Sequence, residues 1–208
     1  MEPPDAISAA QRRTRDRVLS AAADHFARLG YRRTNISDIA DEAGIGKGTV
    51  YQYFDSKIEL LVACVALEKF DLIPRLEEVM EREPAKQLEA YLQIAIRFAI
   101  TAPLSSALIK GDRELSAALA DATEEGLLAD PAQSVAFLGG LVSGAAPGVS
   151  EEQRDRLAQT LLIASTFPAH LSTMQQLMDL TNEDFITTYA RVLARGVASQ
   201  SPAEAEPV

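Results

Sequence analysis

Side chains that donate hydrogen bonds gather between residues 47 and 57, close to Gly48. Thr49 can donate to a base edge or place its methyl group against that of a thymine, and Gly48 lets the backbone approach a partner closely. Lys57 stands in the first turn of a further predicted helix, where its ammonium and the free backbone N–H groups can hold one phosphate together. These residues indicate recognition of nucleic acid rather than catalysis.

Two short helices joined by a glycine turn are predicted to position these side chains. Asn35 can cap a helix over residues 36–43 by accepting a hydrogen bond from the N–H of Asp38. Gly44 stands where a residue of positive φ ends that helix. A second helix opens at residues 46–49 and turns inward Val50, part of Tyr53, and Phe54. This order is the sequence form of a helix-turn-helix, whose second helix enters a major groove.

The segment from Thr34 to Leu60 resembles the TetR family of bacterial transcription regulators. It matches T-x-I-x-D-I-A-x-x-A-G-[VI]-[SG]-K-G-T-[LV]-Y-x-[YH]-F-x-[SN]-K-x-x-L, and the likeness covers roughly residues 12–62. The resemblance implies an all-α fold, with an N-terminal three-helix head and a helical body that binds an effector and dimerises. It further implies a repressor that acts as a homodimer on an inverted-repeat DNA operator.

The same resemblance assigns residues to the DNA. It implies that Lys47, Gly48 and Thr49 lie at base edges, and that Tyr51, Tyr53 and Lys57 grip phosphates. Ser37 matches a position at the start of the preceding helix that reaches a base or a phosphate. The full set of predicted DNA-binding residues is Arg33, Thr34, Ser37, Lys47, Gly48, Thr49, Tyr51, Gln52, Tyr53 and Lys57.

The resemblance, together with helical periodicity and punctuation by proline and glycine, implies four parts of the chain. They are a flexible N-terminal arm (1–11), the DNA-binding domain (12–62), the effector-binding and dimerisation domain (63–198) and a flexible tail (199–208). The helices expected besides the motif span residues 14–29, 56–73, 85–101, 104–119, 132–143, 151–178 with a break near Pro168, and 183–197. No segment shows sustained two-residue alternation, so no strand is predicted.

The charge of the chain is unevenly distributed. The formal net charge is −10, yet residues 1–62 hold nine Lys and Arg against nine Asp and Glu. Between residues 12 and 35, seven arginines stand against two acids. Attraction to phosphate is local, being screened beyond ~8–10 Å at ordinary salt, so an acidic body is compatible with a head that binds DNA. The acids are interpreted as a solvated helix surface, with a cationic ligand as the minor alternative.

The body offers two further sets of candidate residues. An effector pocket is predicted around Phe98, Phe137, Phe167 and His170, together with Met174. A dimer interface is predicted on the C-terminal helices, through Leu157, Leu161, Phe185, Tyr189, Val192 and Leu193. For both sets the alternative is that these side chains only fill or cover the chain's own core.

Other chemistries find little support in the sequence. The stretch from Gly44 to Thr49 lacks the first glycine and the final Ser/Thr of a phosphate loop, and no strand precedes it. Two distant histidines offer no metal cluster, so neither an enzyme nor a cofactor is predicted. The lone Cys64, the missing hydrophobic signal core and the lack of an apolar run long enough for a membrane span favour a cytoplasmic protein. A helical carrier or enzyme whose head ignores DNA, a structural module, and a redox role for Cys64 remain alternatives.

Overall fold

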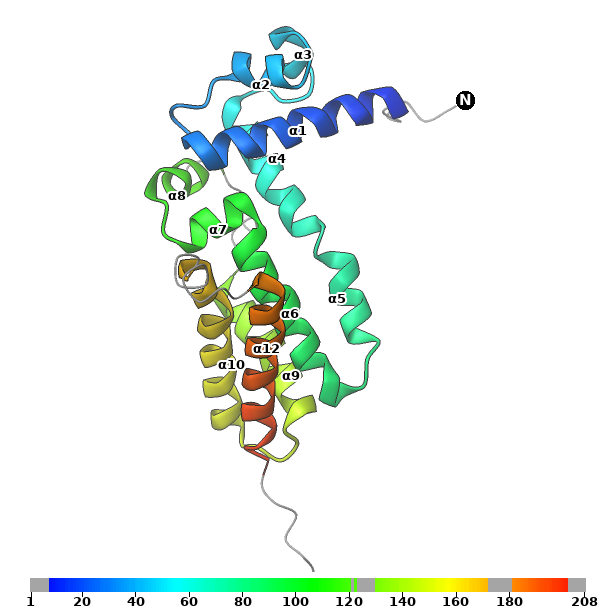
Figure 1. Ribbon diagram of the computed structural model, residues 1–208, viewed down its shortest axis with the longest axis vertical. Helices are drawn as coiled ribbons and strands as arrows, with labels where there is room; N and C mark the ends of the chain where they lie inside the picture. Colours follow the sequence, from blue (N-terminus) through cyan, green and yellow to red (C-terminus); the bar gives the residue numbers. More distant parts are fainter. Residues whose placement is uncertain (1–7, 121, 123–129, 172–180, 202–208) are drawn as a thin grey trace, which may run out of the picture. The chain divides into compact units, whose positions relative to one another are not determined.

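The computed structural model describes residues 8–120, 122, 130–171 and 181–201, and every regular element in these ranges is a helix. This confirms the predicted all-α fold. The chain forms two compact units (Figure 1). Residues 1–69 and 103–127 make the first, called the head unit, and residues 70–102 and 128–208 make the second, called the body unit.

The head unit contains helices from two separate stretches of the chain. They are α1 (Ala9–Leu29), α2 (Ile36–Glu42), α3 (Lys47–Val50), α4 (Lys57–Phe70), α7 (Pro103–Ile109) and α8 (Arg113–Ala120). Phe26 and Ile39 share one buried core with Leu104, Leu115 and Leu119 from α7 and α8, and each is at most 1% exposed. Burying one leucine contributes roughly 1.5–3 kcal/mol, so α7 and α8 are a substantial part of what holds the head unit together.

Helix α1 begins earlier than the sequence analysis predicted. Ser8 Oγ accepts a hydrogen bond from the Gln11 N–H at 3.2 Å, and Gln11 Oε1 accepts from the Ser8 N–H at 2.8 Å. This capping box starts the helix at Ala9. The predicted start near Thr14 was therefore wrong, and residues 9–11, assigned to a flexible arm, are helical. No residue from 9 to 17 is buried, and this part of α1 extends beyond the other helices of the head unit (Figure 1).

Two predicted helices are interrupted. Helix α4 ends at Phe70 instead of near Ile73, and Pro74 lies in the first turn of α5 (Ile73–Met80), where its missing N–H costs nothing. The helix predicted over residues 104–119 is two helices, α7 and α8. Gly111 stands between them with φ 82°, a left-handed conformation that glycine adopts without steric cost.

The body unit is a bundle around one central helix. Its elements are α5, α6 (Pro84–Thr101), α9 (Pro131–Ala145), α10 (Glu151–Thr166), the 3₁₀ helix η1 (Phe167–His170) and α12 (Asn182–Ala198). Helix α6 packs against α9, α10 and α12 (Figure 1). A Cβ on Gly144 would lie 3.0 Å from the Pro84 carbonyl oxygen, so α9 approaches the start of α6 as closely as glycine allows. No single described helix is both long and apolar enough to cross a membrane.

Candidate nucleic-acid interface

The helix-turn-helix forms through short-range contacts that the sequence anticipates. Gly44 adopts φ 67° and ends α2, as predicted. The Ile45 N–H then donates to the Ala40 carbonyl at 3.0 Å and closes the turn. Asn35 caps α2 as expected, but its Oδ1 accepts from the N–H of Ser37 at 3.0 Å rather than from that of Asp38. The cap thus forms an Asx turn with the nearer amide, which satisfies the helix end equally well.

Helix α3 and the residues that follow it, 51–54, turn one side into the core and the other outward. Val50 and Phe54 are 1% and 3% exposed, and Tyr53 is half-buried against the same core. Tyr51 is 44% exposed. The other outward residues are Lys47, Gly48 and Gln52, all exposed, and Thr49, which is half-buried. These residue types present hydrogen-bond donors and a methyl group on one small surface, as a base-reading helix requires.

Packing within the described part of the chain does not require glycine at position 48. Its φ is not positive, and a Cβ built on it would meet no atom within 4 Å. Alanine would also be the better helix former at this position by about 1 kcal/mol. The glycine is therefore consistent with a surface that another molecule approaches closely.

Two residues predicted to contact DNA, Thr34 and Lys57, instead form hydrogen bonds within the head unit. Thr34 is 3% exposed, and its hydroxyl lies 2.7 Å from the Gly30 carbonyl oxygen and 3.1 Å from that of His25. Its assignment as a DNA-binding side chain is corrected, since the hydroxyl caps the end of α1. Lys57 Nζ donates to the carbonyl oxygens of Tyr31 at 2.8 Å and Thr34 at 3.1 Å, and lies 4.4 Å from the centre of the Tyr31 ring. The ammonium thus holds the turn between α1 and α2 instead of facing outward.

Other residues of the predicted set keep free polar groups. Arg33 is exposed, and among the described residues its guanidinium bonds only through Nε, which donates to the Leu29 carbonyl at 2.8 Å. Its terminal nitrogens can therefore pair with a phosphate in two-pronged fashion. Ser37 is half-buried at the start of α2.

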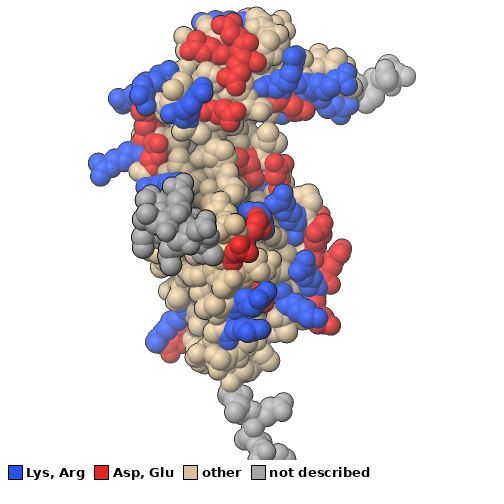
Figure 2. All heavy atoms as spheres, viewed as in Figure 1, with Lys and Arg blue, Asp and Glu red and all other residues tan. Residues whose placement is uncertain are grey.

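The exposed part of α1 carries arginines that form no ion pair within the described chain. Arg12, Arg13 and Arg17 are exposed, and Arg15 lies with its guanidinium carbon 5.5 Å from the centre of the Phe54 ring. The ion pairs of the described residues include none of these four arginines. Figure 2 shows basic side chains gathered along this part of α1. Arg17 was not singled out from the sequence, although its spacing of four from Arg13 puts both on one helix face.

Cys64 has the properties of a core residue. The Sγ atom is buried and donates to the Leu19 carbonyl at 3.5 Å. Burial, with a smaller contribution from the Glu68 carboxylate, raises the pKa of the thiol to about 12. Because the thiolate is the reactive form, a redox role for this residue is not supported.

The residues predicted for an effector pocket lie on three elements of the body unit, α6, α9 and η1, and their role stays a prediction. Phe167 is 53% exposed and lies 6.4 Å, ring centre to ring centre, from the exposed His170. Phe137 is 40% exposed and packs on Tyr91. Phe98 on α6 is half-buried. Met174 lies outside the described residues.

The predicted dimer stripes largely serve the body unit's own core. Leu161 is 2% exposed, and the partly buried side chains packed on that core include Leu157, Phe185, Tyr189 and Leu193. These four side chains remain partly exposed, so their assignment to a dimer interface stays a prediction. Val192 differs, because it is 61% exposed. Two further apolar residues outside the predicted dimer interface are also exposed, Ile163 at 69% and Phe167 at 53%.

This fold and surface define a class of protein. A compact helical head with a glycine turn and an outward second helix is a helix-turn-helix DNA-binding domain. Residues 18–64 match the family described as bacterial regulatory proteins, tetR family. Together with the regulators described below, this match supports the TetR family for this chain.

Curated relatives are similar over the N-terminal part. The fatty acid metabolism regulator protein of Bacillus subtilis is 29% identical over 85 residues, which are 41% of this chain and 44% of that protein. The transcriptional repressor KstR of Rhodococcus jostii is 32% identical over 88 residues, 42% of each chain. The chain thus spans less than half the length of these relatives. The first is named as a regulator protein and the second as a transcriptional repressor.

Solved structures share the fold over nearly the whole chain. A TetR-like transcriptional regulator from Rhodococcus sp. RHA1 aligns with a TM-score of 0.65 at 20% identity, covering 94% of this chain and all of the other. The regulator FadR from Bacillus subtilis, solved in complex with stearoyl-CoA, aligns with a TM-score of 0.61 at 19% identity over 88% of this chain and 97% of its own.

Proposed function

We propose that this chain is a ligand-responsive transcriptional repressor, which binds a double-stranded DNA operator as a homodimer and is released by a small, largely apolar effector. The observation that carries the proposal is the outward surface of α3, where Lys47, Gly48, Thr49 and Tyr51 cluster around a glycine that packing does not require. The alternative is a helical small-molecule-binding protein or enzyme whose head does not act on DNA. Such a protein has no use for this surface.

The division of labour at the DNA follows from the exposure of each group. In this proposal Thr49 and Gly48 read base edges in a major groove. Tyr51, Gln52 and Arg33 stand around them as candidates for phosphate contact, and the arginines of α1 add charge that reaches flanking phosphates. Phosphate contacts orient the protein, while base contacts distinguish sequences.

The decisive experiment measures binding of the chain to duplex DNA from upstream of its own gene, over a series of salt concentrations. Thr49→Ala should weaken operator binding by ~1–3 kcal/mol and leave random DNA almost unaffected, as expected for a base contact. Thr160→Ala is the matched control, since Thr160 is an exposed threonine on α10 of the body unit. Failure of the wild-type chain to bind any duplex more tightly than random DNA would favour the alternative.

The proposed effector has a long apolar portion. Two relatives support this proposal, since FadR was solved with stearoyl-CoA and another matched regulator is named for fatty acid metabolism. A thermal-shift series with fatty acids and acyl-CoA thioesters of increasing chain length tests the idea. Hits should release the operator duplex, because a ligand lowers DNA affinity only by preferring the state that binds DNA poorly. Ligands that stabilise the protein but leave DNA affinity unchanged would contradict the regulatory part.

A further inference from the structure

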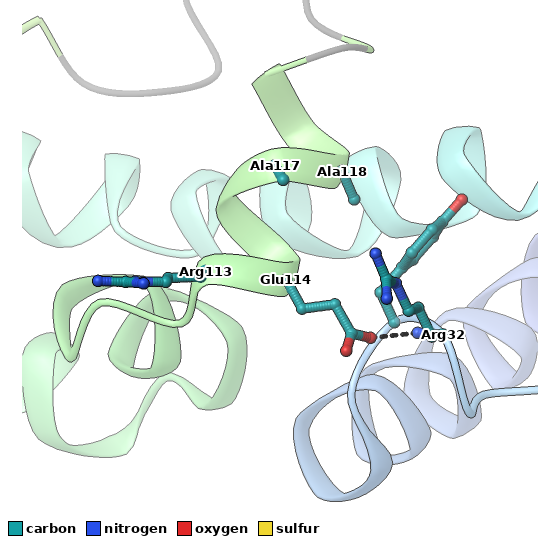
Figure 3. Close-up of a pocket in the computed structure, with 6 residues that line it drawn as sticks. Arg32, Arg113, Glu114, Ala117 and Ala118 are labelled. Carbon is teal, nitrogen blue, oxygen red and sulfur yellow. Dashed lines mark hydrogen bonds between the residues drawn. The ribbon is translucent and has the colours of Figure 1, made fainter.

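Glu114 touches the turn between α1 and α2 from outside the segment that the family match covers. Its carboxylate accepts a hydrogen bond from the backbone N–H of Arg32 (Figure 3). The same carboxylate lies 3.3 Å from the position that a Cβ of Gly30 would occupy. Arg113, the neighbouring residue on α8, points away from this contact (Figure 3). The interaction is therefore specific to Glu114.

The turn is held by two opposite charges. On one side Glu114 binds an N–H group of the turn, and on the other Lys57 binds the carbonyl oxygens of Tyr31 and Thr34. Hydrogen bonds to charged partners are roughly twice as strong as those between neutral groups. The turn leads directly into α2, so the two contacts together fix where α2 begins and, through the glycine turn, where α3 lies.

Helix α8 is firmly mounted on the head unit. Asp112 Oδ1 caps it, accepting from the N–H groups of Glu114 at 2.9 Å and Leu115 at 3.0 Å. Leu115 and Leu119 are buried in the core that α1 and α2 share. The preceding helix α7 begins on the Glu68 carboxylate of α4, which accepts from the N–H of Leu104 at 2.9 Å and the N–H of Ser105 at 2.8 Å. The cap and the buried leucines thus hold α8, and with it the carboxylate of Glu114, against the head unit.

We propose that Glu114 is a positioning residue for DNA recognition, which fixes the α1–α2 turn and thereby the outward surface of α3. This inference rests on the proposed function. It assigns part of the DNA-binding machinery to a helix roughly fifty residues beyond the end of the matched segment at residue 64.

The sign of the effect separates positioning from electrostatics. Removing a carboxylate near a DNA-binding surface makes that surface more positive and should tighten binding to every duplex. Without the positioning hydrogen bond, binding to the operator should instead weaken, because the operator needs an ordered α3, and binding to random DNA should be spared. Glu114→Ala is therefore expected to bind the operator on the order of 10-fold less tightly, the size of one hydrogen bond to a charged group.

Two further variants separate the charge of the Glu114 side chain from its length. Glu114→Gln keeps an acceptor oxygen at the same distance and should bind the operator within a few-fold of wild type. Glu114→Asp keeps the charge but withdraws the carboxylate by one methylene, and should weaken operator binding as alanine does. Asp24→Ala is the matched control, since Asp24 is an exposed acid of α1 with no hydrogen bond or ion pair in the described chain. It should bind as tightly as wild type or more tightly.

Hydrogen exchange of the Arg32 amide, measured by NMR without DNA, gives a readout that does not depend on the proposed function. The amide should exchange on the order of 10-fold faster in Glu114→Ala and Glu114→Asp than in wild type. Equal exchange in all three would overturn the contact itself. If Glu114→Asp binds the operator as tightly as Asp24→Ala does, the positioning role is overturned. This comparison does not need Glu114→Ala, so it can be made even if that variant fails to fold. If the wild-type chain does not bind the operator, the proposed function is contradicted instead.

Discussion

At the scale of single residues, two glycines of the same motif have opposite reasons to be glycine. Gly44 needs its left-handed φ of 67°, which a side chain makes unfavourable by roughly 1–2 kcal/mol. Gly48 has ordinary helical backbone and open space around it. Gly44 is therefore needed for the fold of the turn, whereas Gly48 is needed, in the proposed function, for close approach of DNA to the surface.

Substituting the two glycines should therefore give contrasting results. Gly44→Ala is expected to lower the free energy of unfolding by about 1–2 kcal/mol, whereas Gly48→Ala should leave it unchanged or raise it by up to about 1 kcal/mol. DNA affinity should fall strongly for Gly48→Ala, because the added methyl group stands between the backbone and a base edge. Urea titrations and operator binding of both variants check this. Equal destabilisation of both would show that Gly48 is also a structural glycine.

Cys64 gives a prediction about pH. Because burial raises the pKa of its thiol from near 9 to about 12, the folded state binds the thiol proton more tightly than the unfolded state does. The stabilisation is complete below pH 9 and is lost as the pH rises from 9 towards 12, at up to ~1.4 kcal/mol per pH unit. Urea unfolding between about pH 8 and 11 should show this decline, and Cys64→Ala should flatten it. A wild-type thiol that is alkylated under native conditions as fast as in urea would contradict the burial.

At the scale of elements, the exposed start of α1 should act through charge alone. Arg12→Ala, Arg13→Ala and Arg17→Ala combined should weaken binding to operator and random DNA alike. The slope of log affinity against log salt should fall by about one unit for each phosphate that the protein no longer neutralises. Arg195→Ala on α12 of the body unit, also an exposed arginine near a helix end, serves as the control and should leave the slope unchanged. Weakening confined to the operator would mean that α1 reads sequence.

The elements also show how far the sequence alone reaches. The glycine turn, the inward Val50 and Phe54, and the proline-started helices could be predicted, because each depends on neighbours a few residues away. The bonds of Thr34 and Lys57 could not, because the acceptors of Lys57 lie more than twenty residues away and a short motif does not reveal whether a donor faces inward. For the same reason, the periodicity of residues 104–119 gave no sign that Leu104 and Leu115 complete the head unit's core.

At the scale of the whole molecule, exposed apolar side chains on the body unit suit the proposed homodimer. Ile163, Phe167 and Val192 are each more than half exposed, while the other stripe residues are used internally. Val192→Glu and Ile163→Glu should shift a dimer towards monomer in sedimentation velocity, because an interface core excludes unpaired charge. Met80→Glu, at an exposed apolar residue of α5, is the control. A dimer unaffected by both glutamates would place the interface elsewhere.

The discontinuous head unit also affects how the chain can be cut, exchanged and synthesised. A fragment that stops at residue 62 or 69 lacks Leu104, Leu115 and Leu119, so it leaves the surfaces of α1 and α4 that these leucines cover open to water. A chimera made by joining only the N-terminal third to another body would carry the same defect, and a better one would transfer residues 103–120 as well. On the ribosome, the head unit can complete its core only after α8 has emerged, by which time α5 and α6 have been made. Its folding therefore requires closing a long loop, which slows it relative to a three-helix domain of purely local contacts.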